Sequence, residues 1–250
     1  TLVQKMREQL VAELEQRTLA DQGARDAQEI KDWFIAYFSH EMRTPLSVIA
    51  GSIDLMEYST DSATLARQRK AIRTASRGMV RLMDDLIDIS ALETGQLSLV
   101  VEKMNLQQLM DEIGQEFLPV AQQKGLAIQH EYEAKPLWVR GDVQRVRQIL
   151  YNLVENGLKY TAAGGVALSM DKRDDVVRIC ISDTGPGIAV EDQRYIFEPY
   201  VRAANLDVAG SGLGLTISRR LLQQMGSDLD MDSVLGEGSS FWFELPIVAD

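Results

Sequence analysis

Apolar residues recur every three or four positions along two consecutive stretches of the chain. This spacing is typical of amphipathic helices, and the polar stretch 58–63 between the two stretches predicts a turn. We expect an antiparallel helical hairpin over residues 30–95. Because a lone hairpin cannot cover both apolar stripes, the pattern predicts a homodimer in which two hairpins form a four-helix bundle. The stripes run through Ile30, Phe34, Phe38, Met42, Leu46, Ile49, Ile53 and Met56, and then through Leu65, Ile72, Ala75, Met79, Leu82, Leu86 and Ile89.

The pattern is weaker before this hairpin and changes after it. Residues 1–29 carry only a thin apolar stripe and predict a signalling helix or linker, and 93–97 predicts a linker between domains. Residues 99–248 then alternate between helical and strand-like runs, which predicts a mixed-sheet α/β domain. The expected fold class is an α + α/β sandwich, with the helical hairpin first. We expect helices at about 105–124, 142–160 and 212–225, capped in the first two cases by Asn105 and Asp142, and strands at about 126–133, 164–170, 175–183, 228–234 and 239–245.

The composition narrows the classes of function. The 250 residues carry a formal net charge of −11, which argues against a nucleic-acid-binding surface. No apolar run approaches the roughly 18–20 residues of a membrane span, and no signal peptide opens the sequence. The single cysteine, Cys180, fits a reducing compartment, and its place in the apolar run 176–181 predicts a buried, inert thiol. Two histidines leave no obvious zinc cluster.

His40 lies on the first predicted helix of the hairpin. At about 100° per residue it is about 200° from Phe38 and from Met42, on the face opposite the apolar stripe. A histidine in such a position is more often an ordinary surface residue. Neutral imidazole is nevertheless a nucleophile near pH 7, and Glu41 beside it can accept the ring proton. Pro45 removes a hydrogen bond to the Glu41 carbonyl and loosens the helix next to the imidazole.

Asn152, Asn156 and Lys159 share one face of the predicted helix 142–160, because they are four and three residues apart. Amide oxygens can bind Mg²⁺, and a lysine can contact phosphate as a point charge. The alternative interpretation is an ordinary polar helix face, although asparagine is a poor helix former. The pattern indicates a candidate site for a metal and phosphates.

Two glycine-rich segments add to this picture. Asp183 ends a predicted strand and is followed by Gly185 and Gly187, which allow a flat ligand to approach, while the carboxylate can accept from an exocyclic amino group. Gly212 and Gly214 precede the last predicted helix, where backbone N–H groups and the helix dipole favour an anion. Each pattern is weak alone, since a simple turn or an aspartic-protease-like triplet resembles the first.

The hairpin motif resembles that of a known family. The segment Phe38-Ser-His-Glu-Met-Arg-Thr-Pro-Leu46 is similar to the phospho-acceptor box of the commonest class of sensor histidine kinases. The resemblance implies that His40 is phosphorylated and that Glu41 is its base. It also implies that Thr44 orients the water that dephosphorylates the partner response regulator.

The second domain resembles the ATP-binding domain of the same kinases, which is of the Bergerat or GHKL type. Residues 152–160 resemble its asparagine box, 179–188 and 210–215 its glycine boxes, and 196–202 its phenylalanine box. The resemblance implies ATP and Mg²⁺ as cofactors. The residues implied in binding ATP are Asn152, Asn156, Lys159, Tyr160, Asp183, Gly185, Gly187, Gly212, Leu213 and Gly214.

The family assigns particular roles to some of these positions. Asn156 is implied as the Mg²⁺ ligand, and Asp183 as the acceptor for the adenine amino group. Arg202 is the candidate for stabilising charge on the transferred phosphoryl group. The chain departs from the family in the segment that corresponds to the ATP lid. The late part of this segment, 203–209, is short and contains no basic residue.

Two functions are compatible with these motifs. The first is ATP-dependent autophosphorylation of His40 in a homodimer, followed by transfer to an aspartate of a response-regulator receiver domain. The alternative, which the lid allows, is a kinase-like regulatory module of the kind found in hybrid kinases of the RetS type. Such a module would dimerise with, or dephosphorylate, another histidine kinase or regulator. In either case we expect no nucleic-acid partner, and we expect the cytoplasmic portion of an inner-membrane protein whose sensor and membrane-spanning segments are not in this chain.

Overall fold

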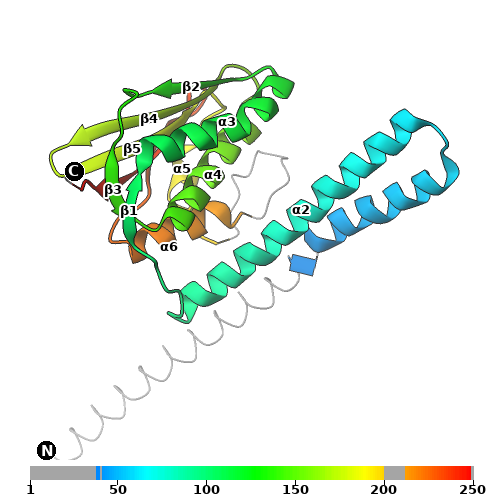
Figure 1. Cartoon of the computed structure of the whole chain (residues 1–250), viewed down its shortest axis with the longest axis horizontal. Coiled ribbons are helices and arrows are strands. Elements are labelled where there is room, and N and C mark those ends of the chain that lie inside the picture. Colours follow the sequence, from blue (N-terminus) through cyan, green and yellow to red (C-terminus); the bar gives the residue numbers. More distant parts are fainter. Residues whose placement is uncertain (1–37, 40, 200–211, 249–250) are drawn as a thin grey trace, which may run out of the picture. The chain divides into compact units, whose positions relative to one another are not determined.

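The structure is a computed structural model that describes residues 38–39, 41–199 and 212–248. By their contacts the residues form two units, 1–81 and 82–250. The first unit contains most of a helical hairpin, and the second contains a mixed α/β domain (Figure 1). The predicted fold class is therefore confirmed.

The hairpin consists of a first helix, described at 38–39 and 41–58, and of α2, Ser62–Glu93. Residues 59–61 connect the two helices, as the polar stretch predicted. The Asp61 carboxylate accepts hydrogen bonds from the backbone N–H of Thr64 at 2.8 Å and from its hydroxyl at 2.7 Å. These bonds satisfy the open first turn of α2 and fix the point at which the helix begins.

Much of the apolar surface of the hairpin is exposed in the single chain. Within the described residues 41–81, no apolar side chain is fully buried. Leu46, Ile53 and Leu55 are 51%, 47% and 55% exposed. The hairpin therefore has an apolar face that its own two helices do not cover.

The second unit contains a five-stranded sheet in the order β2-β4-β5-β7-β6 and a separate two-stranded sheet of β1 and β3. In the larger sheet β2 is parallel to β4, and all other neighbours are antiparallel, so the sheet is mixed as predicted. The elements are β1 Glu102–Asn105, α3 Leu106–Lys124, β2 Ala127–Glu131, β3 Trp138–Gly141, α4 Val143–Tyr160, β4 Gly165–Arg173, β5 Val176–Asp183, α5 Val190–Gln193, α6 Gly214–Gln224, β6 Asp230–Val234 and β7 Gly238–Pro246.

Both predicted N-caps are confirmed. The Asn105 side chain accepts from the N–H of Gln108 at the start of α3. The Asp142 side chain accepts from two backbone N–H groups of the first turn of α4. Each side chain thus replaces the hydrogen bonds that a helix cannot make at its own N-terminus.

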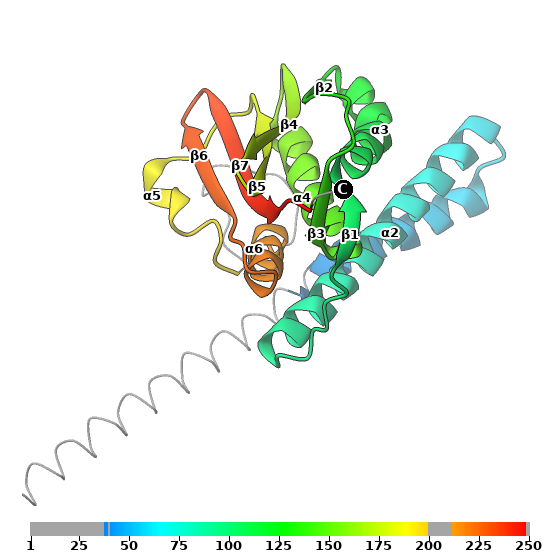
Figure 2. The same ribbon diagram turned by 60° about the vertical axis from the view of Figure 1, so that its left-hand side comes forward.

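Helices α3 and α4 pack on one face of the large sheet, and α6 packs against α4 (Figure 2). Strand β5 shows the alternation that this arrangement requires, because Val177, Ile179 and Ile181 are buried against the helices. Cys180 lies between them on the opposite face and is only half-buried, with its Sγ 3.5 Å from the hydroxyl of Ser182. The predicted burial of Cys180 is therefore wrong: an apolar run gives no information on which residues point to which face.

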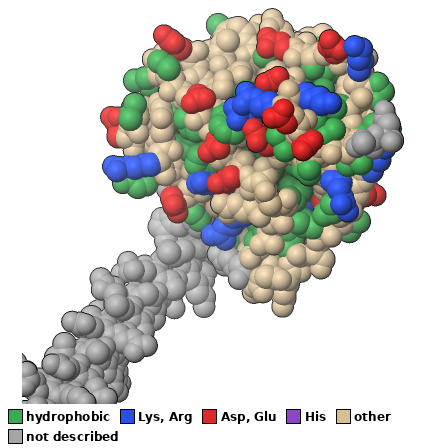
Figure 3. Space-filling view, turned by 90° about the vertical axis from the view of Figure 1, so that its left-hand side faces the viewer, with side chains coloured by type: hydrophobic (Ala, Val, Ile, Leu, Met, Phe, Trp, Pro, Cys, Tyr) green, Lys and Arg blue, Asp and Glu red, His purple; other side chains and the backbone are tan. Residues whose placement is uncertain are grey.

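Charged side chains on the outer face of the sheet pair with opposite charges. Arg178 on β5 contacts Glu244 on β7 at 2.8 Å, and its guanidinium lies 3.6 Å from the centre of the Trp242 ring. On the face shown in Figure 3, basic and acidic side chains lie next to one another rather than gathering by sign. That face therefore has no patch of a single charge.

The last turns of α2 belong, by their contacts, to the second unit. Ile89 is only 7% exposed and lies in the same apolar core as the residues of α3 and α4, with Leu92 packed against it. Helix α2 ends at the predicted linker, where Gly95 adopts a left-handed φ of 65°. The contacts thus divide the chain inside α2, before the linker that the sequence indicated.

Candidate nucleotide-binding site

Helix α4 supplies the polar face on which the candidate site is built. Asn152, Asn156 and Lys159 occupy successive turns of one side of the helix. The opposite side is anchored in the core, since Ile149, Leu150, Leu153 and Val154 are at most 2% exposed. The apolar side therefore fixes the direction in which the three polar side chains point.

The two asparagines differ in their surroundings. The Asn152 amide donates to the carbonyl oxygen of Gly214 and to the hydroxyl of Ser218, both at 3.4 Å, and so contacts the first turns of α6. Asn156 is half-buried, and its side chain makes no hydrogen bond within the residues that the structure describes. Asn152 thus has a structural contact to α6, whereas the amide oxygen of Asn156 is available to a ligand.

Lys159 and Tyr160 lie against each other at the end of α4. The Lys159 ammonium is 3.1 Å from the Tyr160 hydroxyl and 4.7 Å from the centre of the Tyr160 ring. The lysine therefore brings a positive charge to the same end of the helix as Asn156. A cation and a free amide oxygen within one helical turn suit a phosphorylated ligand with a bound metal.

Asp183 stands at the end of β5, where the sequence placed it. The backbone N–H of Gly185 donates to its carboxylate at 2.8 Å. Burial raises the pKa of this carboxyl group above 3.8, against the opposing effect of hydrogen bonds from the backbone N–H groups of Gly185 and Ser239. A half-buried carboxylate of this kind gains from any further donor that a ligand brings.

Gly157 brings helix α4 close to this carboxylate. A Cβ atom at Gly157 would lie 2.8 Å from Cγ2 of Val166 and 3.5 Å from Cβ of Asp183. Only a residue without a side chain allows so close a contact of the helix with β4 and β5. As a result the helix that carries Asn156 and Lys159 lies close to β5, the strand that ends at Asp183.

Thr161, directly after α4, was missed by the sequence reasoning. Thr161 is 4% exposed, and its hydroxyl oxygen is buried without a hydrogen-bond partner among the described residues. A Cβ atom at Gly185 would lie 3.4 Å from this oxygen and 2.7 Å from Oδ1 of Asp183. Buried hydroxyls are almost always paired, so an unpaired one beside a half-buried carboxylate fits a site that receives the polar edge of a ligand.

The glycine-rich segments adopt the conformations that their glycines allow. Gly187 has a φ of 67°, and a Cβ there would lie 2.0 Å from the carbonyl oxygen of Val234, so no other residue fits. Gly212 has a φ of 66°, and α6 begins two residues later at Gly214. Within the described residues no side-chain hydrogen bond caps α6 at Leu213, and the N-terminus of a helix favours an anion.

The hairpin residues of the candidate site are described only in part. Glu41 is half-buried and Thr44 is exposed, both on the helix 41–58. His40 and Arg202 lie outside the described residues. Among the predicted residues of the second unit, the structure shows contacts of Asn152 with Gly214, of Lys159 with Tyr160 and of Asp183 with Gly185. The binding roles of these residues, and the roles of His40, Glu41, Thr44 and Arg202, stay predictions.

Family models match the two parts of the chain separately. Residues 30–95 match the His Kinase A (phospho-acceptor) domain. Residues 141–249 match the histidine kinase-, DNA gyrase B-, and HSP90-like ATPase. The first match contains His40, and the second contains every residue of the candidate nucleotide site.

Curated relatives cover nearly the whole chain. The sensor protein GacS of Pseudomonas syringae pv. syringae is 35% identical over 238 residues, which is 92% of this chain and 26% of the relative. The sensor histidine kinase RcsC of Escherichia coli (strain K12) is 30% identical over 230 residues, which is 90% of this chain and 24% of the relative. The chain thus spans about a quarter of the length of these relatives.

Solved structures show the same arrangement of elements. Full-length ShkA in complex with AMPPNP is 31% identical, with a TM-score of 0.66 over 86% of this chain and 46% of that chain. The histidine kinase ThkA in complex with the response regulator protein TrrA is 25% identical, with a TM-score of 0.64 over 90% of this chain and 64% of that chain.

A phospho-acceptor hairpin followed by an ATP-binding α/β domain defines the core of sensor histidine kinases. Both modules are present here in that order. The chain belongs to the sensor histidine kinase family.

Proposed function

We propose that this chain is a protein-histidine kinase core that transfers the γ-phosphoryl group of ATP to His40. A response-regulator receiver domain would then accept the group on an aspartate. One observation supports the proposal most strongly: Asp183 and the unpaired Thr161 hydroxyl both lie beside Gly185, where β5 meets α4, the helix that carries Asn156 and Lys159. Such a site offers donors and acceptors for both the base and the phosphates of a nucleotide.

Within this site each side chain has a chemical task. The ionised Asp183 would accept from the exocyclic amino group of adenine, and Lys159 would contact the phosphates. No group of three His, Cys, Asp or Glu side chains within the described residues is arranged to hold a metal. Mg²⁺ would therefore bind through the amide oxygen of Asn156 and the phosphate oxygens, a combination that suits its preference for hard oxygen ligands.

The phosphoryl step would use the hairpin residues. A ring nitrogen of neutral His40 would form the new bond to the γ-phosphorus while the bond to the β-phosphate oxygen breaks and ADP leaves. Glu41 would accept the single ring proton, which lies on the nitrogen that does not attack. Arg202 would stabilise charge on the transferred group. In a separate phosphatase reaction, Thr44 would orient the water that hydrolyses the phosphoryl group from the aspartate of the receiver domain.

We further propose that the chain acts as a homodimer. The exposed apolar residues of the hairpin, Leu46, Ile53 and Leu55 among them, support this, because a second hairpin would cover them. The ThkA structure contains a response regulator, which supports a receiver domain as the second partner.

None of the described helices is long and apolar enough to cross a bilayer. Because its phosphoryl donor would be ATP, we place the chain on the cytoplasmic side of a longer sensor protein.

The decisive experiment is an autophosphorylation assay of the purified chain with labelled ATP and Mg²⁺. We expect label that is lost on acid treatment and that is absent in His40→Gln. The matched control is His130→Gln, because His130 on β2 is the other of the chain's two histidines and should leave the label intact. Nucleotide binding without label would instead support the regulatory module. No nucleotide binding by calorimetry would overturn the kinase proposal.

A further inference from the structure

The polar stripe of α4 extends beyond the nucleotide residues toward the start of the helix. Arg145 and Gln148 precede Asn152 and Asn156 by steps of three and four residues. At about 100° per residue these four side chains lie within an arc of about 80° of the helix. The side of α4 that would contact the nucleotide therefore presents Arg145 and Gln148 in its first turns.

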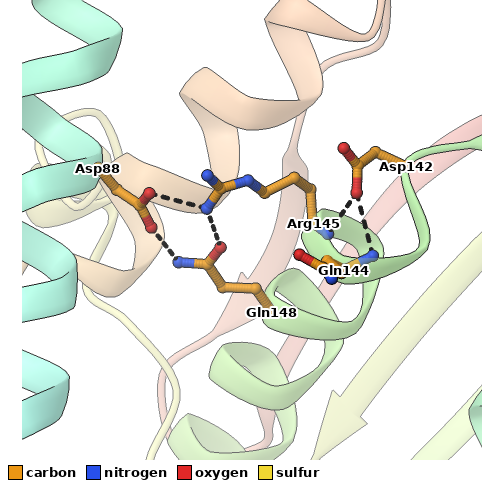
Figure 4. A network of polar contacts seen from close by, with 5 residues as sticks. All are labelled: Asp88, Asp142, Gln144, Arg145 and Gln148. Atoms are coloured by element: carbon orange, nitrogen blue, oxygen red, sulfur yellow. Dashed lines mark hydrogen bonds and ion pairs between the residues drawn. The ribbon is translucent and has the colours of Figure 1, made fainter. Parts of the chain in front are cut away.

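These two side chains bind one buried carboxylate of α2 (Figure 4). Arg145 Nη1 donates to Oδ1 of Asp88 at 2.7 Å, and Gln148 Nε2 donates to Oδ2 at 2.7 Å. Arg145 Nη1 also donates to Oε1 of Gln148 at 2.9 Å, which closes a ring of three residues. Asp88 is only 7% exposed, so this site is largely shielded from water. Both of its carboxylate oxygens accept a hydrogen bond there.

A second contact holds the same end of α4. Asp142 accepts from the N–H groups of Gln144 and Arg145 through Oδ1, and from the N–H of Val100 through Oδ2 at 2.9 Å. Val100 follows the linker after α2. The first turn of α4 is thus bound both to the last turns of α2 and to the segment that leaves them.

The position of α4 itself does not depend on this ring. Val146, Ile149 and Leu150 are fully buried in the core of the domain and alternate with the ring residues along the helix. Loss of the Asp88 carboxylate would therefore leave Asn152 and Asn156 in place. It would release the end of α2, because Asp88 supplies the acceptor for both donors.

We propose that Asp88 is a positioning residue for phosphoryl transfer. By binding Arg145 and Gln148 it holds the nucleotide-facing side of α4 in one orientation on α2, the helix that continues the phospho-acceptor hairpin. Asp88 thereby sets the rate at which the group reaches His40 and contributes nothing to nucleotide affinity. This inference rests on the proposed kinase function, because its effect on rate can be measured only if the chain phosphorylates His40.

The test compares Asp88→Asn with Asp84→Asn in the full chain. Asp84 is exposed on the same helix, so its variant makes the same change of charge outside the ring. For Asp88→Asn we expect kcat of autophosphorylation to fall about tenfold or more, the order of loss that misorientation of reactants produces. The dissociation constant for ADP should change by less than about twofold, as a bound nucleotide contacts other residues. Asp84→Asn should change neither quantity.

Two further variants separate positioning from general damage to the fold. Asp88→Glu keeps the charge and should recover part of the lost kcat. The double variant Asp88→Asn/Arg145→Gln should be no slower than the slower single variant, because both changes remove the same contact. If Asp88→Asn failed to fold, Gln148→Ala, which removes one donor and no charge, would provide the same comparison.

An unchanged kcat in Asp88→Asn, or a loss of ADP affinity by the same factor as kcat, would overturn the inference. Hydrogen exchange of the backbone amides of 82–93 tests the Asp88 contact without a kinase assay. We expect faster exchange in Asp88→Asn than in Asp84→Asn. If the wild-type chain took no label, the kinase proposal would fail, and faster exchange would show that the Asp88 contact exists nonetheless. Equal exchange in both variants would refute the contact itself.

Discussion

Asp183 shows how one residue of this protein combines stability with binding. Burial raises its pKa above 3.8, so the folded chain holds a proton there more tightly than the unfolded chain does. Stability from this group is present below the unfolded pKa and is lost as the pH rises through the folded pKa. The ionised form is nevertheless the one that can accept from an adenine amino group. Burial thus makes the ionised form of Asp183 less favourable, and a hydrogen bond from a ligand can offset this cost.

We predict that ATP binding weakens as the pH falls through the raised pKa of Asp183. The protonated carboxyl group loses an acceptor site, so binding of the nucleotide is linked to release of this proton. Calorimetric titrations from neutral pH down to the lowest pH at which the chain stays folded would show the trend. Asp183→Asn should bind ATP more weakly and without this dependence. A wild-type pH profile that matches that of Asp183→Asn would contradict the assignment.

At the scale of elements, α4 determines the site because of how closely it approaches the sheet. Its polar face follows from spacing in the sequence, but its contact with β4 and β5 depends on Gly157. Thr161 and Asp183 come within reach of one another through this contact. A change that moves α4 outward by a methyl group would therefore disturb both the packing and the site.

We predict that Gly157→Ala lowers the free energy of unfolding by about 1–3 kcal/mol, the usual effect of overpacking. The new Cβ would meet Cγ2 of Val166 at 2.8 Å. Gly78→Ala on α2 is the matched control, since no atom lies within 4 Å of its Cβ position. There the same substitution should stabilise by about 0.5–1 kcal/mol through helix propensity. Urea unfolding measures both changes, and a stabilising Gly157→Ala would show that the helix does not contact the sheet so closely.

At the scale of the whole molecule, the two units bury their apolar residues differently. The second unit has a continuous core of its own, with Leu106, Ile149 and Phe243 fully buried. The described part of the hairpin has no such core and exposes residues such as Ile53. The homodimer that we propose would therefore cover apolar surface of the hairpin, whereas the α/β domain has a core of its own.

We predict that Ile53→Glu shifts the chain from dimer to monomer and raises the dimer dissociation constant by about tenfold or more, as expected for a charge placed in a buried apolar interface. Leu118→Glu is the control, because Leu118 on α3 is 43% exposed, close to the 47% of Ile53. Sedimentation velocity over a concentration series would compare the two. If both variants sedimented like the wild type, the Ile53 face would not be the dimer interface.

Local patterns in the sequence predicted most of the fold. The caps Asn105 and Asp142, the turn before Ser62 and the strands of the large sheet were found because neighbouring residues specify them. Strands β1 and β3 and the short helix α5 were missed. Strand β1 exists only because Glu102–Asn105 pairs with Trp138–Gly141, and neither four-residue segment has an alternation long enough to indicate a strand.

The sequence by itself determined the identity and spacing of the site residues, because Asn152, Asn156 and Lys159 need only a helix to share a face. Tertiary structure alone decided what lies beside them. Gly157 on α4 contacts Val166 on β4, and Arg145 on α4 binds Asp88 on α2. The burial of the unpaired Thr161 hydroxyl likewise depends on the packing of separate elements. The physical reason is that helical and strand periods are local, whereas burial and close approach depend on how separate elements pack.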